Sequence, residues 1–294
     1  MPSSAVLRLA RPFDLPLSLA AAASFLPRAG AAPTVLRVGT HIDCRSVIIE
    51  IRQTSRTPPV IEASSTIPIC RYQLSDMARW LVSAELDLRP FYRIAAPHPI
   101  MGPITKWLRG LKPLRPLSLF EMAIVAITEQ QLSLAAAFHI RTRLINRFGT
   151  PTEGLWIFPN PVALAEASLS DLRACGLSRR KAEYVRGIAT RVVKGSLNFD
   201  ALKRETTQEA YAYLMDQRGF GDWSAQYILA RGLGRPDWLP SGDTGLRGAV
   251  GKLLARGRRL SPRQLERALS PFAPFRGLAA FYLSVAARLR PGRQ

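Results

Sequence analysis

Two glycines within Gln217–Tyr227 constrain the fold more than any other feature, because they stand between two stretches of helical pattern. Gly219 and Gly221 flank a single residue, and glycine enters the positive-φ region without the steric cost of a side chain. The chain can therefore turn sharply here and let another backbone come close. The amides that open the following helix would form an anion site, suited to a phosphate of a nucleic-acid backbone.

The segments on either side of this turn predict two helices. Thr206 and Glu209 have the spacing of a capping box, which opens a helix that runs to about residue 216. A second helix is expected over residues 223–232, with Trp223 and Tyr227 one turn apart on the same side. The sequence therefore predicts two helices joined by a tight turn.

Two aspartates accompany the second helix. Asp222 is expected to be its N-cap, with the carboxylate folded back onto backbone amides. Asp243 follows Pro240 and directly precedes Thr244, where another helix is expected to begin, so capping is one role for its carboxylate. A carboxylate held in this way can also oppose a positive charge that develops on a sugar.

The secondary-structure signals change near residue 90, and 294 residues favour two domains over one. Residues 1–90 predict a small mixed α/β domain, with β-branched strands over 35–42 and 46–51 that pair as antiparallel neighbours. Helices are expected over 18–25 and 71–88. From residue 91 to 294 caps, glycine stops and prolines separate successive helices, and strand signals nearly vanish. The fold class is therefore α+β, with an all-helical second region.

The charge balance implies a polyanionic partner. Lysine and arginine number 41 against 21 aspartates and glutamates, a formal net charge of +20, which favours nucleic acid or an acidic membrane surface. An arginine-rich composition from a GC-rich genome is the alternative explanation. No stretch reaches the ~20 unbroken apolar residues that span a bilayer. The apolar run over 17–26 imitates a secretory signal, but Asp14 and Pro16 interrupt that pattern.

Cysteine and histidine provide no obvious metal site. Cys44, Cys70 and Cys175 are widely spaced and odd in number, so they predict neither a disulfide framework nor a paired-cysteine site. The three histidines lie far apart, without an acidic partner at ligand spacing. A reducing compartment such as the cytoplasm fits this composition.

Several motifs occur in one order along the chain. They are Phe120-Glu121, Gln130-Gln131-Leu132-Ser133, Gly176-Leu177-Ser178 with Lys181-Ala182, Gly219–Ala225, Pro240-x-x-Asp243 and Pro274-Phe275-Arg276. Through them, residues 118–285 resemble the helix-hairpin-helix DNA glycosylases, and within these the DNA-3-methyladenine glycosylase II family. Residues 11–14 also resemble the start of that family's N-terminal α/β domain. The resemblance implies two helical subdomains with an active cleft between them, and a helix-hairpin-helix motif over about 206–232.

The resemblance makes Asp243 the catalytic carboxylate. Its role would be to oppose the positive charge on the sugar as the N-glycosidic bond breaks, and to orient or deprotonate the attacking water. Family members that also cleave the DNA strand carry a lysine nucleophile where this chain has Trp223. An indole cannot form a Schiff base, so we expect base excision without lyase activity, as the first step of base excision repair.

Three aromatic residues, Trp223, Tyr227 and Phe275, match the pocket of the alkylation-repair branch of the family. Purines alkylated at N3 or N7, such as 3-methyladenine, are cations, and aromatic ring faces favour a desolvated cation by roughly 1–2 kcal/mol. Phe275 stands where well-known members have tryptophan, which leaves the substrate range open. Packing in a helical core is the alternative role of these rings.

The resemblance also assigns residues to DNA. Gln131 has the place of the wedge that fills the gap left by a base turned out of the stack, with loop packing as the alternative. The hairpin would contact the DNA backbone through Gly219, Phe220, Gly221 and Ser224.

Cofactors and partners follow from the same resemblance. The backbone carbonyls of Met215, Gln217 and Gly219 match those that hold a monovalent cation beside a DNA phosphate. No cofactor is expected to be required, and an iron-sulfur cluster is excluded because no cysteine follows Cys175. We expect a monomer that acts on damaged double-stranded DNA in the cytoplasm, associated with the nucleoid and not with a membrane.

Two other functions stay open at this point. A damage-sensing or architectural DNA-binding protein would keep the hairpin without turnover, although Asp243 at its matched position argues against this. A glycosylase for deaminated or oxidised bases is the second alternative. Trp223 in place of lysine and the aromatic pocket argue against oxidised guanine but not against hypoxanthine.

Overall fold

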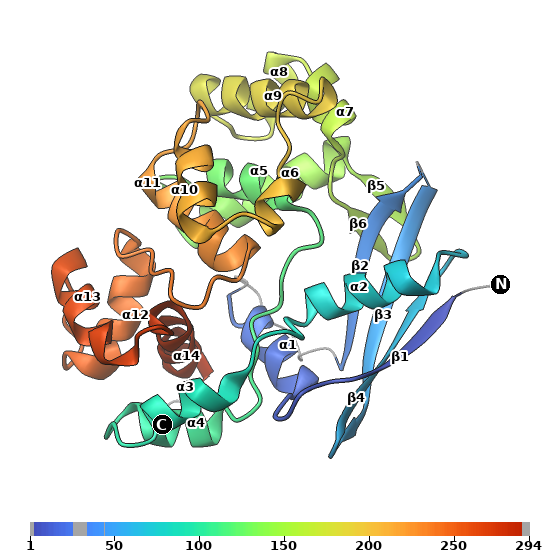
Figure 1. Ribbon diagram of the computed structural model, residues 1–294. Coiled ribbons are helices and arrows are strands. Elements are labelled where there is room, and N and C mark those ends of the chain that lie inside the picture. The colour runs from blue at the N-terminus through green and yellow to red at the C-terminus, as the bar shows by residue number, and fades with distance from the viewer. Residues whose placement is uncertain (1–2, 26–33, 44, 290–294) are drawn as a thin grey trace.

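An antiparallel sheet forms the N-terminal part of the chain (Figure 1). The computed structural model describes residues 3–25, 34–43 and 45–289. The sheet has the spatial order β1-β4-β3-β2, and its strands are β1 (Ser4–Arg8), β2 (Val35–Ile42), β3 (Arg45–Arg56) and β4 (Pro59–Ser65). The predicted antiparallel pairing of the two β-branched segments is confirmed, with Val38 opposite Ile49.

The details of this N-terminal part differ from the prediction at one strand and at the bounds of two helices. β4 is not among the predicted strands, although its side chains alternate, with Ile61 and Ala63 buried. The helix expected over 71–88 ends early, as α2 (Arg71–Leu81), because the backbone enters the positive-φ region at Ser83. The alanine-rich helix expected over 18–25 is α1 (Leu15–Ala23), which starts earlier because Asp14 is its N-cap.

Helices dominate the rest of the chain, and most begin at a serine, threonine, asparagine or aspartate cap. Before the hairpin they are α3 (Leu88–Ala95), α4 (Met101–Trp107), α5 (Leu119–Glu129), α6 (Leu134–Phe148), α7 (Pro161–Glu166), α8 (Leu169–Ala174), α9 (Arg179–Val193) and the 3₁₀ turn η1 (Asp200–Lys203). From the hairpin onward they are α10 (Thr207–Met215), α11 (Asp222–Tyr227), the π-helix η2 (Ile228–Gly232), α12 (Thr244–Leu254), α13 (Pro262–Leu269), the 3₁₀ turn η3 (Ser270–Phe272) and α14 (Arg276–Leu289). The α+β class is confirmed. Among the described residues, no helix is both long and apolar enough to cross a membrane.

The region predicted to be all-helical also contains a short β-hairpin. β5 (Thr150–Thr152) pairs with β6 (Leu155–Ile157), and the pair lies beside β2 (Figure 1). A hydrogen bond of 3.2 Å between His41 Nε2 and Thr150 Oγ1 joins the two parts of the chain. This hairpin therefore attaches the helical region to the edge of the N-terminal sheet.

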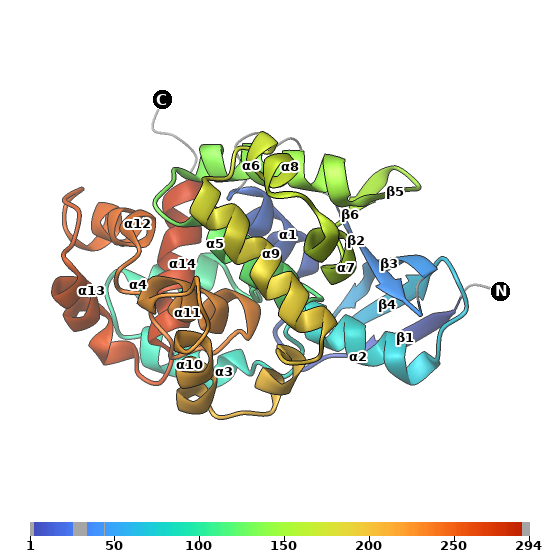
Figure 2. The same ribbon diagram turned by 90° about the horizontal axis from the view of Figure 1, so that it is seen from above.

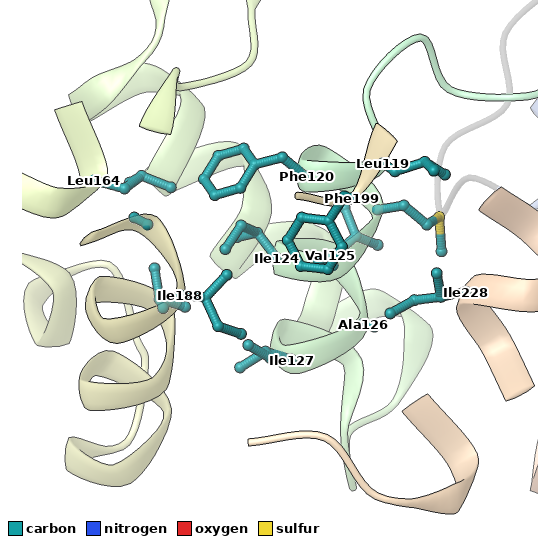
Figure 3. Close-up of a cluster of buried hydrophobic side chains, with 14 of the residues drawn as sticks. Leu119, Phe120, Ile124, Val125, Ala126, Ile127, Leu164, Ile188, Phe199 and Ile228 are labelled. Carbon is teal, nitrogen blue, oxygen red and sulfur yellow. The ribbon is translucent and has the colours of Figure 1, made fainter. Parts of the chain in front are cut away.

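The first helical core surrounds α5, which is buried on nearly every face. Figure 3 shows Ile124 and Ile127 of α5 facing Ile188 of α9, and Ala126 facing Ile228 of η2. A helix that is apolar all round has to lie inside a protein. α5 is therefore the central helix of this core, and its C-terminal end sets the position of the loop that follows it.

A second core forms where α3 and α4 return to pack against α12, α13 and α14 (Figure 2). Ala21 of α1 is buried in this core, whereas Leu114 and Leu117 pack against a third core, formed by residues of the N-terminal sheet and α2 such as Ile49, Ile61 and Leu74. A division of the chain at residue 90 therefore separates elements that share a core. The two helical cores flank the space in which the candidate site lies.

Candidate active site

A largely apolar cavity of about 240 Å³ lies between the two helical cores. Pockets for drug-sized ligands commonly have volumes of about 300–1,000 Å³. This cavity is smaller, so it suits a smaller ligand, of about the size of one nucleobase. Its lining includes the aromatic and acidic side chains Trp223, Tyr227, Phe25, Phe281, Glu129 and Asp243. These residues come from α5, α11 and α14, from the segment after α1 and from the N-cap of α12, so the cavity joins parts of the chain from near both ends and from the middle.

The hairpin has the predicted turn, with one boundary corrected. The capping box of Thr206 and Glu209 opens α10, as expected. Gly219 has φ of 104°, and a Cβ there would lie 2.8 Å from the ring of Tyr184, so both conformation and space require glycine. Gly221, not Asp222, is the N-cap of α11. The Asp222 carboxylate instead accepts 2.7 Å hydrogen bonds from Tyr211 and Gln226.

Trp223 and Tyr227 form one continuous wall of the cavity. Their ring centroids are 4.9 Å apart and the planes differ by only 13°, so the rings are stacked. α11 places them one turn apart, and η2 continues from Tyr227 with a wider turn instead of the uniform helix expected to residue 232. Burial raises the pKa of the Tyr227 hydroxyl, and the neighbouring Glu129 carboxylate adds to the shift. Tyr227 is therefore a neutral aromatic surface.

Asp243 lies at the tryptophan end of this wall, with both carboxylate oxygens oriented. Oδ1 accepts a 2.7 Å hydrogen bond from the amide of Leu246, which makes Asp243 the N-cap of α12. Oδ2 accepts a 3.2 Å hydrogen bond from Trp223 Nε1. The expected capping role is confirmed, and it leaves the carboxylate on the cavity surface. A carboxylate fixed by two donors is preorganised for electrostatic work.

Phe275 does not line the cavity. Its ring packs in the second core, with its centroid 6.0 Å from that of Phe91. The aromatic side chains facing the site from that side are Phe281 of α14 and Phe25, just beyond the end of α1. Their rings are parallel within 10°, with centroids 6.4 Å apart. Phe275 directly precedes α14, whereas Phe281 lies within that helix.

Two arginines hold Phe25 in place. The guanidinium carbons of Arg288 and Arg231 lie 4.3 and 4.8 Å from its ring centroid, within cation-π range. Burial lowers the pKa of Arg288, and the positive charge of Arg231 lowers it further. The end of α1 is therefore part of the cavity wall, and no sequence motif indicated this role for Phe25.

The loop after α5 presents Gln131 to solvent. Gln131 is exposed and has φ of 55°, a conformation that few non-glycine residues adopt. Its neighbour Gln130 donates 2.8 Å hydrogen bonds to the Gly219 carbonyl and to Ser224 Oγ. This pair of bonds ties the loop to the hairpin turn, which places Gln131 beside the predicted DNA-binding backbone.

Two residues predicted to contact DNA point inward instead. Ser224 is buried and its hydroxyl accepts the bond from Gln130, so it organises the loop and is not available to a phosphate. The Phe220 ring is partly buried and packs in the first core near Phe199, with centroids 6.4 Å apart. Gly221 is exposed at the start of α11. The part of this turn that stays accessible to solvent at Gly221 is therefore its backbone.

The three carbonyls predicted to hold a cation lie at this same turn. Gly219 accepts a hydrogen bond from Gln130, and Gln217 accepts one of 3.1 Å from the amide of Phe220. A carbonyl oxygen has two lone pairs, so one lone pair stays available on each. These hydrogen bonds leave acceptor capacity on the Gln217 and Gly219 carbonyls, and a monovalent cation at Met215, Gln217 and Gly219 stays a prediction.

The fold and this cavity define a helix-hairpin-helix protein with a base-sized aromatic site. Residues 124–274 match the family model described as HhH-GPD superfamily base excision DNA repair protein, and because the match covers about half of the chain, the chain belongs to this superfamily. The resemblance to DNA-3-methyladenine glycosylases is confirmed by proteins of that name among its relatives.

Three relatives define the extent of the similarity. The Bacillus subtilis protein YfjP is 34% identical over 133 residues, which are 45% of this chain and 46% of that protein, so the chain spans about half of its length. A DNA-3-methyladenine glycosylase of Bacillus subtilis is 29% identical over 223 residues, 74% of each chain. The structure of a 3-methyladenine DNA-glycosylase from Archaeoglobus fulgidus has 26% identity and a TM-score of 0.81, over 97% of this chain and 98% of that one.

Proposed function

We propose that the chain is a monofunctional DNA glycosylase that hydrolyses the N-glycosidic bond of alkylated purines, such as 3-methyladenine, in duplex DNA. The observation that carries this proposal is the stacked Trp223–Tyr227 wall with the Asp243 carboxylate bonded at its edge. A base turned out of the double helix would stack on the wall, inside a cavity of about its own size. The relatives named above support the same chemistry.

Asp243 would act on the sugar. When the glycosidic bond breaks, its electron pair passes to the base, which leaves uncharged if it was alkylated and cationic. The sugar then gains positive charge, and the Asp243 carboxylate opposes that charge from a fixed position. Water attacks the anomeric carbon and its proton passes to the carboxylate or to solvent. The lesion supplies part of the driving force, so one acid suffices.

Strand cleavage is not part of this proposal. Lyase chemistry needs an amine to form a Schiff base, and residue 223 carries an indole whose nitrogen donates to Asp243. We expect no covalent enzyme-DNA adduct after borohydride reduction of a reaction with an abasic or lesion-containing duplex. A trapped adduct on a denaturing gel would contradict this expectation.

DNA would be held by backbone groups of the hairpin and by the exposed Gln131. The turn offers Gly219 and Gly221, a monovalent cation at the three carbonyls would bridge to a phosphate, and Gln131 would enter the stack left by the base. The charge of +20 favours duplex DNA over other partners. We further propose a monomer that needs no cofactor and acts on the cytoplasmic nucleoid.

Substitution of Asp243 tests the mechanism. Asp243→Asn keeps an N-cap side chain for α12 while removing the charge, so folding should be preserved. Release of 3-methyladenine from a single-lesion duplex should fall by about 10²–10⁴-fold. Asp200→Asn is the matched control, because Asp200 is exposed, pairs with Lys203 and does not line the cavity. Base release at the wild-type rate by Asp243→Asn would overturn the proposal.

A glycosylase for deaminated bases is the second candidate, favoured by guanidinium groups in the cavity lining. Arg231, Arg235 and Arg288 all reach the cavity, and their N–H groups suit a carbonyl oxygen such as that of hypoxanthine. Arg235 already donates to the carbonyls of Leu202 and Glu205. Parallel release assays on duplexes with 3-methyladenine and with hypoxanthine separate the two candidates, and no release from either would favour a non-catalytic DNA-binding protein.

A further inference from the structure

A second carboxylate, Glu129, lines the cavity and has no part in the mechanism above. Glu129 is the last residue of α5, and only 10% of its side chain is exposed. Burying an ionised carboxylate lowers the stability of the fold unless the charge is paired or hydrogen-bonded. Arg141 of α6 supplies one partner, with its Nη1 3.2 Å from Oε1. The Tyr227 hydroxyl is a second hydrogen-bond partner. A carboxylate has about four acceptor sites, so these two partners leave acceptor capacity on Glu129, which lines the cavity.

The backbone around Glu129 is fixed on both sides. Lys181 of α9 donates hydrogen bonds of 3.0 and 2.7 Å to the carbonyls of Thr128 and Gln130. Gln130 is bonded in turn to the hairpin. Since the preceding and the following residue are both held, the position of Glu129 is set by the fold and not by a flexible loop. A group that reads a ligand needs this kind of support.

Glu129 and Asp243 meet the aromatic wall at different rings. Asp243 is bonded to Trp223 Nε1, whereas Glu129 neighbours the hydroxyl of Tyr227, where it adds to the effect of burial in raising the Tyr227 pKa. Because the two rings are stacked, both carboxylates border one aromatic surface in the cavity. A purine stacked on the wall with its glycosidic bond at Asp243 would extend its far edge toward Glu129. That edge carries the substituent at position 6 of the ring.

We propose that Glu129 is a specificity-determining residue that accepts a hydrogen bond from the exocyclic amino group of an adenine-derived base. This inference rests on the proposed glycosylase function. An ionised carboxylate only accepts hydrogen bonds, so it can pair with the 6-amino group of an adenine-derived base. The 6-oxo group of a guanine-derived base is also an acceptor, so its lone pairs would repel those of the carboxylate. Charged, desolvated hydrogen bonds discriminate strongly, because the wrong partner leaves the buried acceptor unsatisfied. The site would therefore favour 3-methyladenine over 7-methylguanine.

The experiment compares both bases in one reaction. Duplex DNA treated with a methylating agent contains 3-methyladenine and 7-methylguanine, and the two released bases are quantified together by chromatography. Glu129→Gln replaces one acceptor oxygen by an amide donor at nearly constant size. The ratio of 3-methyladenine to 7-methylguanine release should fall by about tenfold, since a charged hydrogen bond is lost on one base only. A loss of folding lowers both rates and leaves this ratio unchanged.

Two variants serve as controls. Glu121→Gln removes another acid of α5 that does not line the cavity, so its release ratio should equal that of the wild type. Arg141→Met removes the ion pair but keeps Glu129, so the preference for 3-methyladenine should persist. A wild-type ratio in Glu129→Gln, with both bases released, overturns the inference alone. Release of neither base by the wild-type protein overturns the proposed function instead.

Discussion

The two aromatic sides of the cavity differ in how the chain builds them. The hairpin side uses Trp223, Tyr227 and Asp243, which belong to one short stretch of sequence and are linked by stacking and a hydrogen bond. The opposite side joins Phe25 to Phe281, from the two ends of the chain. The first side holds the carboxylate that we propose to act on the sugar, and the second closes the cavity. Chemistry is thus encoded locally, while the shape of the site depends on how the N-terminal part docks.

This contrast has a consequence for substitution. Changes on the hairpin side should alter the rate of base release, because they touch the group that faces the sugar. Changes on the Phe25 side should alter which bases fit, because they change cavity size without touching Asp243. Each side can be tested by truncating one aromatic residue.

Truncation of Trp223 should have the largest effect on the hairpin side. Trp223→Ala removes both the stacking surface and the donor to Asp243, so 3-methyladenine release should fall by about 10²–10³-fold. Trp223→Phe keeps a ring and loses only the donor, with an expected loss of about tenfold. Single-turnover rates measure both. Equal losses in the two variants would mean that stacking contributes nothing beyond the hydrogen bond.

Truncation of Phe25 should have a smaller effect and a different signature. Phe25→Ala removes the ring between Arg231 and Arg288 and enlarges the cavity, so 3-methyladenine release should fall by only about tenfold. Release of the bulkier 3-ethyladenine should fall less, or rise. The comparison of the two sides fails if Phe25→Ala lowers both rates as much as Trp223→Ala does.

The smallest effect on activity is expected from substitution of Glu121, which should change the pH dependence of folding stability but not base release. Burial raises the pKa of the Glu121 carboxyl from 4.5 to about 7. The Glu121 backbone amide donates to Ser118 Oγ, the N-cap of α5, and this bond does not depend on the side chain. Between these pH values the unfolded chain releases a proton that the folded chain keeps, so stability falls as pH rises from about 4.5 to 7 and stays lower above.

Glu121→Gln should remove this dependence. At pH 8 the variant should be more stable than the wild type by roughly 2–3 kcal/mol, with base release unchanged. Urea unfolding at pH 5 and pH 8 provides the measurement. A variant that shows the same pH dependence as the wild type would place the responsible group elsewhere.

Local rules were sufficient for much of the hairpin side. Thr206 with Glu209 marks the start of α10, and Gly219 marks the turn, since only glycine fits its φ and the nearby Tyr184 ring. Asp243 before Thr244 predicts an N-cap, and capping fixes the direction of its carboxylate. The predicted N-cap of α11 was wrong by one residue. Gly221 occupies that position, and the Asp222 carboxylate accepts a hydrogen bond from the Tyr211 hydroxyl instead. Helix ends are commonly ambiguous at this level.

Tertiary structure alone decided the rest of the site. Phe275 and Phe281 lie close together in the sequence, yet the first packs against Phe91 in the second core while the second stacks with Phe25 at the cavity. Ser224 has the sequence place of a DNA contact, but Gln130 occupies its hydroxyl. The turn, the aromatic pair and the capped acid could thus be predicted without the structure, because caps, turns and helical spacing act within a few residues. The closure of the cavity by Phe25 needed the assembled cores, because a contact between residues far apart in the chain leaves no local pattern.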